Sequence, residues 1–181
     1  MRFILPLIAC LLITSCVQNT QISYRIIDAP MSGEINDYGT LGLRDVHLPD
    51  YWSDRRIPIA ITNANAEIER SDQYRLSENP SVVFYQAFRS SLQKFNKAQV
   101  YNAPWPPETK PKHRIEIFIT SLIGELGGKV EMEGYGYVIG EKSQQIHFNT
   151  SEKTADTTID AYLQSIAIGI DDAVKVIYSR F

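Results

Sequence analysis

The chain has 181 residues, 22% of them charged, and a formal net charge of −3 at pH 7. Acidic and basic residues are interspersed without a run of lysine or arginine. This pattern argues against a nucleic-acid-binding protein, and the chain has no polybasic patch that would bind anionic lipid headgroups. The length suits one ordinary domain with a hydrophobic core of its own.

The first 15 residues have the pattern of a bacterial secretory signal. Arg2 supplies a positive charge, and the apolar run 3–13 is too short for a membrane span, which takes about 20 residues. Residues 13–15 (Ile-Thr-Ser) lead directly into Cys16. An aliphatic residue and two small residues before a cysteine resemble the lipobox of bacterial lipoproteins, in which the cysteine thiol takes up a diacylglyceryl group and becomes the mature N-terminus.

Cys16 is therefore predicted to be lipidated and to anchor the protein to a membrane. The alternative is a small buried cysteine, but the polar segment 18–21 that follows favours lipidation. We predict a signal peptide at 1–15, a lipidated N-terminus and tether at 16–22, and a single domain at 23–181.

The surroundings of this anchor indicate a compartment. Cys10 leaves with the signal peptide, so the mature chain has no disulfide and depends on its hydrophobic core for stability. In lipoproteins of this kind an aspartate after the lipidated cysteine usually favours the inner membrane, and this chain has Val17 there. The resemblance implies an outer-membrane protein that faces the periplasm.

Alternation of apolar residues predicts strands in the first half of the chain. A short strand is expected at 23–27. In 41–48 the apolar residues change phase halfway, which predicts a β-bulge near Arg44 or Asp45. Isoleucines alternate through 57–61, and Pro58 lacks a backbone N–H, which favours an edge strand or a position beside a bulge.

Two long helices are predicted. Asn79 is a good N-cap with Pro80 at the first helical position. The second helix is expected to begin at Asp156 or Thr157, where Thr157 and Asp160 fit a capping box. The apolar stripes of the two helices run from Phe84 to Phe95 and from Ile159 to Ile177.

Between the helices, three strand patterns with short connections predict an antiparallel meander over 113–149. A turn at 63–65 is expected to lead into a short strand that contains Ile68. Prolines around Trp105 predict a rigid loop. The predicted fold class is α+β, a largely antiparallel sheet with two long helices packed on it.

No motif indicates catalysis or a cofactor. The three histidines lack partners at metal-ligand spacing, and there is no Gly-x-Ser-x-Gly elbow or phosphate-binding loop. Glu131 and Glu133 share a strand face and could form an acid–base pair of a hydrolase, but a solvated strand face is the simpler interpretation. We predict no enzyme, no metal and no cofactor.

Aromatic residues are the candidates for contact with a partner. Because exposed aromatic side chains are enriched at interfaces, we predict that five of the aromatic residues bind a partner. Burial in the core is the alternative for each, since small cores also hold tyrosine and tryptophan. The candidates are Tyr51, Trp52, Trp105, Tyr135 and Tyr137.

Several segments in order resemble the auxiliary lipoproteins of ABC-type, MCE-linked intermembrane transport, the PqiC-like family. They are the lipobox at Cys16, SYRI, LGLRDVHLPDYWSDRRI, the helix segment YRLSENPSVVFYQAFRSSLQKF and the loop VYNAPWPP. The chain departs from the family pattern in three places: Leu76 stands where tryptophan is usual, the helix entry reads Ser-Glu-Asn-Pro, and Trp52 stands where leucine is usual. None of these motifs is catalytic.

The resemblance implies an accessory protein that is anchored in the outer membrane and docks an envelope-spanning MCE-type component of a lipid transporter. It also implies self-association. The alternative within the same compartment is a lipid-carrying lipoprotein with an acyl-binding cavity of its own.

Overall fold

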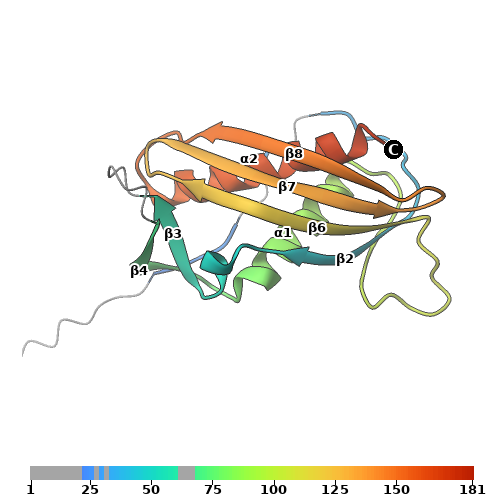
Figure 1. The fold of residues 1–181 in the computed structure, drawn as a ribbon, viewed down its shortest axis with the longest axis horizontal. Helices are drawn as coiled ribbons and strands as arrows, with labels where there is room; N and C mark the ends of the chain where they lie inside the picture. Colours follow the sequence, from blue (N-terminus) through green and yellow to red (C-terminus); the bar gives the residue numbers. More distant parts are fainter. Residues whose placement is uncertain (1–21, 27–28, 31–32, 61–67) are drawn as a thin grey trace, which may run out of the picture.

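The computed structural model describes residues 22–26, 29–30, 33–60 and 68–181. Cys16, the signal segment and the turn expected at 63–65 lie outside the described residues. The described chain has an α+β fold of two helices and two mixed, largely antiparallel sheets (Figure 1), which confirms the predicted fold class.

The larger sheet has five strands in the order β5-β2-β6-β7-β8. The predicted meander is confirmed, because β6, β7 and β8 are joined antiparallel in chain order. At the other side β2 lies parallel to both β5 and β6. The bounds are β2 Leu41–His47, β5 Val100–Asn102, β6 His113–Gly124, β7 Lys129–Ile139 and β8 Gln144–Lys153.

The smaller sheet has the order β1-β4-β3, with β1 at Ile22–Tyr24, β3 at Arg56–Ala60 and β4 at Ile68–Leu76. β3 is an edge strand, as the proline at position 58 predicts. β1 begins one residue before the predicted strand 23–27 and ends at Tyr24, where its pairing with β4 stops. Residue 27 lies outside the described residues.

The predicted bulge in β2 is confirmed. Leu43 lies opposite Ile115 of β6, whereas Asp45 lies opposite Glu116, so Arg44 is the additional residue. The bulge keeps Leu43 and Val46 both buried although their spacing is odd.

Helix α1 spans Pro80–Lys94 and α2 spans Ile159–Tyr178. The side-chain oxygen of Asn79 accepts the N–H of Ser81, as predicted for the cap of α1. The predicted capping box of Thr157 with Asp160 is wrong. The N-cap of α2 is Thr158, whose hydroxyl accepts the N–H of Ala161 at 3.2 Å.

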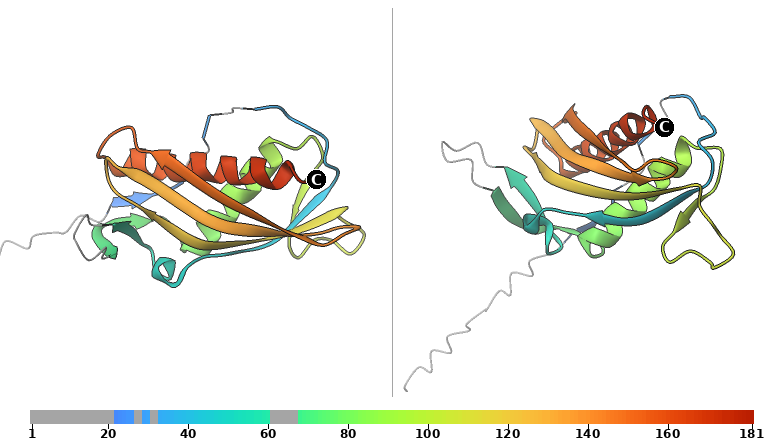
Figure 2. Two further views of the ribbon diagram at one scale, coloured as in Figure 1. Left: turned by 45° about the horizontal axis from the view of Figure 1, so that its top comes forward. Right: turned by 45° about the vertical axis from the view of Figure 1, so that its right-hand side comes forward.

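Both helices cover one face of the five-stranded sheet (Figures 1 and 2). Helix α1 contacts β2 and β5, and α2 contacts β7 and β8. Their apolar stripes meet the inward side chains of the strands, and the hydroxyl of Tyr178 donates to the carbonyl oxygen of Leu92 at 2.8 Å. The core therefore lies between helices and sheet, and neither α1 nor α2 covers the other face of the sheet in the described part of the chain.

Candidate functional site

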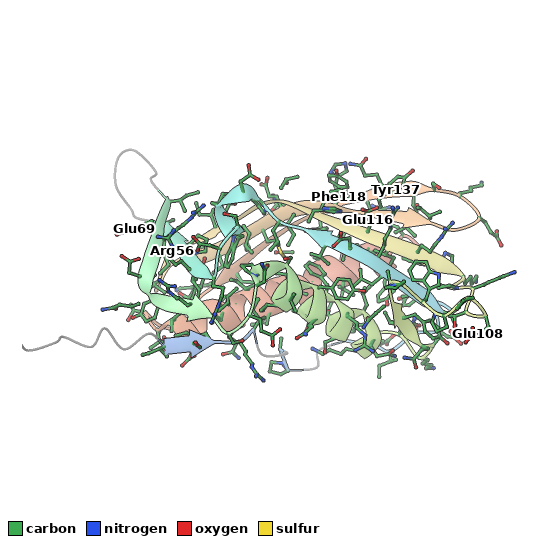
Figure 3. The ribbon with its side chains drawn as sticks, turned by 90° about the horizontal axis from the view of Figure 1, so that it is seen from below. Arg56, Glu69, Glu108, Glu116, Phe118 and Tyr137 are labelled. Atoms are coloured by element: carbon green, nitrogen blue, oxygen red, sulfur yellow. The ribbon has the colours of Figure 1, made fainter. Side chains whose placement is uncertain are left out.

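The face of the five-stranded sheet that points away from both helices is called the outer face here. Residues alternate along β6, β7 and β8 between buried positions and positions open to solvent, and the latter form this face. Figure 3 shows Glu116, Phe118 and Tyr137 gathered there. The outer-face residues include Arg44, His47, Arg114, Glu116, Phe118, Glu131, Glu133, Tyr135, Tyr137, His147 and Asn149.

Four rings cross the outer face in one row, which we call the aromatic ladder: His47, Phe118, Tyr135 and His147. The strand register places each ring directly opposite the next. The ring centroids of His47 and Phe118 are 4.3 Å apart, those of Phe118 and Tyr135 are 4.8 Å apart, and both pairs are stacked. Tyr135 and His147 follow at 5.7 Å. Such cross-strand pairs stabilise the sheet and present a continuous aromatic surface.

Charged groups border the ladder at β2. His47 Nε2 lies 2.8 Å from a carboxylate oxygen of Glu116, and Arg44 lies 3.6 Å from the other oxygen. Tyr137 occupies the same row as Glu116 and is 38% exposed. The two predicted partner residues Tyr135 and Tyr137 thus lie on the outer face, the first half-buried in the ladder and the second exposed.

Trp105 lies near the edge of the same face, in the chain between β5 and β6. A Cβ atom at Gly42 of β2 would meet the indole ring at 2.8 Å, so the ring packs directly over the backbone of that glycine. The hydroxyl of Tyr85 fastens the start of the loop, because it donates to the carbonyl oxygen of Leu43 at 2.9 Å and accepts the N–H of Ala103 at 3.2 Å. Burial raises the pKa of this tyrosine. Trp105 is half-buried.

Tyr51 and Trp52 lie elsewhere, in the short 3-10 helix η1, Asp50–Trp52. Trp52 is only 2% exposed, and its ring meets Phe84 of α1 edge to face at 5.1 Å. The Tyr51 hydroxyl accepts the N–H of Leu122 at 2.8 Å. The side chain of Trp52 therefore belongs to the core, and Trp52 is not part of the docking surface proposed below. Tyr51 is held to the backbone of β6 by its hydrogen bond.

The two glutamates considered for acid–base chemistry, Glu131 and Glu133, are exposed on β7. A side-chain oxygen of Glu133 accepts a hydrogen bond from Asn149 at 3.0 Å, as on an ordinary solvated strand. Within the described ranges there is no group of three or more His, Cys, Asp or Glu residues placed to hold a metal ion. Burial and the neighbouring Lys112 lower the pKa of His113.

The space between sheet and helices is filled by side chains. The large residues there have exposures below 2%, and they include Phe84, Phe88, Leu92, Ile115 and Ile117. Five hollows on the described surface all open to solvent. The described part of the chain therefore offers no observation in favour of an acyl-carrying cavity. Neither described helix is long and apolar enough to cross a bilayer.

Sequence reasoning missed most of the ladder. Phe118 alternates in phase with Glu116 and Thr120, on the polar side of β6, and an aromatic residue in that phase is the signal that could have located it. For His47 and His147 the sequence indicates strand positions without metal-ligand partners, which is typical of surface or half-buried residues. Their position at the two ends of the ladder depends on the register of four strands, which no local pattern specifies.

A family model described as the ABC-type transport auxiliary lipoprotein component matches residues 24–177. No curated protein matched the chain.

Similar folds occur among solved structures. A crystal structure of an uncharacterised protein aligns over 89% of this chain and 98% of its own, with a TM-score of 0.66 and 14% identity. Protein XCC0632 from Xanthomonas campestris aligns over 84% and 92%, with a TM-score of 0.62 and 9% identity.

A PelC dodecamer from Paraburkholderia phytofirmans aligns more loosely, with a TM-score of 0.43 and 8% identity over 81% of this chain and 94% of that chain. The first two structures support the fold, and the family match spans nearly the whole described domain. This chain belongs to the family of ABC-type transport auxiliary lipoproteins.

Proposed function

We propose that this protein is an outer-membrane lipoprotein that docks the envelope-spanning MCE-type component of a lipid transporter through the outer face of its five-stranded sheet. The observation that carries the proposal is the aromatic ladder with Tyr137 beside it, on a sheet face that neither helix covers. Stacked and half-exposed aromatic rings are typical anchors of protein interfaces. The auxiliary role in transport comes from the family.

The tether supports the orientation of this docking surface. Cys16 precedes Ile22, the first residue of β1, by six residues, which span about 20 Å when extended. The membrane surface therefore lies near the small sheet. Arg56 and Glu69 of that sheet mark one end of the molecule, and Glu108 of the Trp105 loop marks the other (Figure 3). The outer face extends from the end near the membrane to the end that points into the periplasm.

Site-specific photocrosslinking in envelope membranes tests the docking surface. A photoreactive residue in place of Tyr137 is expected to form an adduct with the MCE-type component. The matched control is Val82, which is 42% exposed on α1 and therefore lies on the helix layer. Adducts from position 82 but not from 137 would place the contact on the helices and refute the proposal.

A variant pair separates the ladder from general surface effects. Phe118→Ser removes one of the two inner rings of the ladder, and partner recovery in a pull-down is expected to fall about tenfold. Val82→Ser removes an exposed apolar side chain of the helix layer and should leave recovery unchanged. Equal recovery from both variants would argue against docking through the ladder.

A further inference from the structure

Two neighbouring hollows share Trp105, Arg114 and Ile139 as walls, and we call them the Trp105 hollows. Their volumes are about 430 and 310 Å³, near the lower end of the range for ligand-binding pockets. Both open on the outer face at the end of the sheet farthest from the small sheet. They differ from the ladder in chemistry, because every charged residue in their walls is a cation.

Four cations line the Trp105 hollows and no carboxylate does: Arg44, Lys110, Lys112 and Arg114. The three residues other than Arg44 form no ion pair within the described part of the chain, and Arg44 has one contact with Glu116, at 3.6 Å. All four side chains are exposed. This concentration of positive charge contrasts with the net charge of −3 of the whole chain.

Trp105 supplies an apolar wall and a hydrogen-bond donor. The ring atoms nearest to Gly42 are Cζ3 and Cε3, which lie on the edge of the indole opposite to its N–H group. The N–H therefore points away from β2, and no hydrogen-bond partner for it exists among the described residues. With Ile139 beside it, the site combines an apolar wall, a free N–H donor and guanidinium groups.

We propose that the Trp105 hollows bind an extended acidic segment of the partner protein, with a bulky apolar side chain against Trp105 and Ile139 and flanking carboxylates on Arg44 and Arg114. The inference deepens the proposed docking function and rests on it. Charge complementarity favours this occupant, since guanidinium groups bind carboxylates in a bidentate manner.

The position of the site favours a protein segment over a lipid headgroup. Arg114 is at the start of β6, whose 12 residues span about 40 Å. The end of β6, at Gly124, is next to Tyr162, which donates a hydrogen bond to the carbonyl oxygen of Pro58 in the small sheet. The tether enters at that small sheet, so the hollows lie at the end of the molecule remote from the anchoring membrane.

A peptide titration of the full-length lipoprotein in detergent micelles tests the inference. The probe is a synthetic peptide of alternating glutamate and leucine, and the comparison peptide has glutamine in place of glutamate. Acrylamide quenching of tryptophan fluorescence reports on Trp105, because the only other tryptophan, Trp52, is 2% exposed. The acidic peptide is expected to shield Trp105, and the glutamine peptide to bind about tenfold more weakly.

Two double variants with the same loss of charge provide the matched control. R44Q/R114Q should weaken binding of the acidic peptide about tenfold. K129Q/K153Q removes two exposed cations from the opposite end of the sheet and should leave the affinity within about twofold of the wild type. Equal affinities of the two double variants, or of the two peptides, would overturn the inference.

The remaining outcomes separate the site from the proposed docking function. If phosphatidylglycerol vesicles shield Trp105 and the acidic peptide does not, the site binds headgroups and the inference is wrong. If Tyr137 crosslinks to the MCE-type component while the peptide never binds, the docking function stands and the inference fails. If the peptide binds as expected without that crosslink, the site is supported and the proposed partner is wrong.

Discussion

The indole N–H of Trp52 donates a hydrogen bond to the carbonyl oxygen of Leu122, 3.2 Å away. The pairing of β2 with β6 ends at Phe118, so Leu122 lies beyond the end of β2. Tyr51 accepts the N–H of the same leucine at 2.8 Å. Two adjacent side chains of η1 thus take the place of a neighbouring strand and satisfy the backbone of β6 where β2 has ended.

Replacement of Trp52 by phenylalanine should therefore destabilise the fold. The substitution leaves a buried carbonyl oxygen without its donor, and we expect the free energy of unfolding to fall by about 1–3 kcal/mol. Trp105→Phe is the control, because the N–H of Trp105 has no partner among the described residues, and it should cost less than about 1 kcal/mol. Urea unfolding measures both, and similar losses would contradict the structural role of Trp52.

The buried ion pair between the helices gives a second prediction. Lys94 of α1 and Asp171 of α2 form an ion pair with side-chain exposures of 14% and 7%, and Lys94 also donates to the carbonyl oxygen of Ala29 at 2.7 Å. Lys94→Met leaves a buried carboxylate without its counter-ion, and the free energy of unfolding should fall by about 3–5 kcal/mol.

A double variant identifies the source of that loss. Lys94→Met with Asp171→Leu removes both charges and should cost less than the sum of the single substitutions. The exposed pair of Asp72 with Arg56, 3.8 Å apart, is the comparison, and Asp72→Asn should cost at most about 1 kcal/mol. Additive losses in urea unfolding would show that the two buried charges are not coupled.

Stability should also depend on pH through Glu152 of β8. Burial raises the pKa of Glu152 above its ordinary value of 4.5, and the charge and hydrogen bond of Asp172 raise it further. A carboxyl group whose pKa is higher in the folded chain stabilises the fold below its unfolded pKa. This contribution is lost as the pH rises through the folded pKa.

Glu152→Gln should accordingly be more stable than the wild type at neutral pH and lose that advantage at pH values below 4.5. Urea midpoints across this pH range measure the difference. Asp172→Asn removes one cause of the shift but leaves the burial, so it should shrink the dependence without abolishing it. A constant difference between Glu152→Gln and wild type at every pH would rule out this contribution.

The comparison of sequence with structure shows which features are local. The phase change of apolar residues around Arg44 predicted the bulge in β2, because burial of one strand face fixes which residues must alternate. The parallel pairing of β2 with β5 had no such signal, since it depends on contacts far apart in the sequence. The predicted N-cap of α2, Thr157, lies one residue before the observed N-cap, because Thr157 and Thr158 are both good N-caps and tertiary geometry selects between them.

The candidate site divides in the same manner. Alternation along β7 correctly places Tyr135 and Tyr137 on one face. Trp52 follows a turn and has no periodicity to show that it points inward. The Trp105 hollows depend on the approach of a loop to Gly42, where the missing Cβ makes room for the ring, and sequence spacing alone does not reveal such a contact.

That contact gives a further prediction. A methyl group at Gly42 would lie 2.8 Å from the ring of Trp105 and 2.9 Å from Pro111, so Gly42→Ala should displace the indole. We expect stronger acrylamide quenching of Trp105 and a loss of about 1–3 kcal/mol in the free energy of unfolding. Unchanged quenching would mean that the position of the Trp105 ring does not depend on the missing Cβ atom at Gly42. Gly128→Ala is the comparison for quenching, because its methyl group would lie 2.9 Å from the side chain of Glu125, in the connection between β6 and β7.

The lipid anchor gives the last prediction, and it needs two variants of adjacent residues. Cys16→Ser removes the thiol that we propose takes up the diacylglyceryl group, so labelling with radioactive palmitate should disappear. Val17→Asp keeps the thiol but places an aspartate after it, so labelling should persist while the protein moves from the outer-membrane to the inner-membrane fraction. Each acyl methylene buried in a bilayer contributes about 0.8 kcal/mol, and loss of the chains should also abolish stable association with the outer membrane. Palmitate labelling that survives Cys16→Ser would refute the anchor, whereas an unchanged location of Val17→Asp would refute only the sorting.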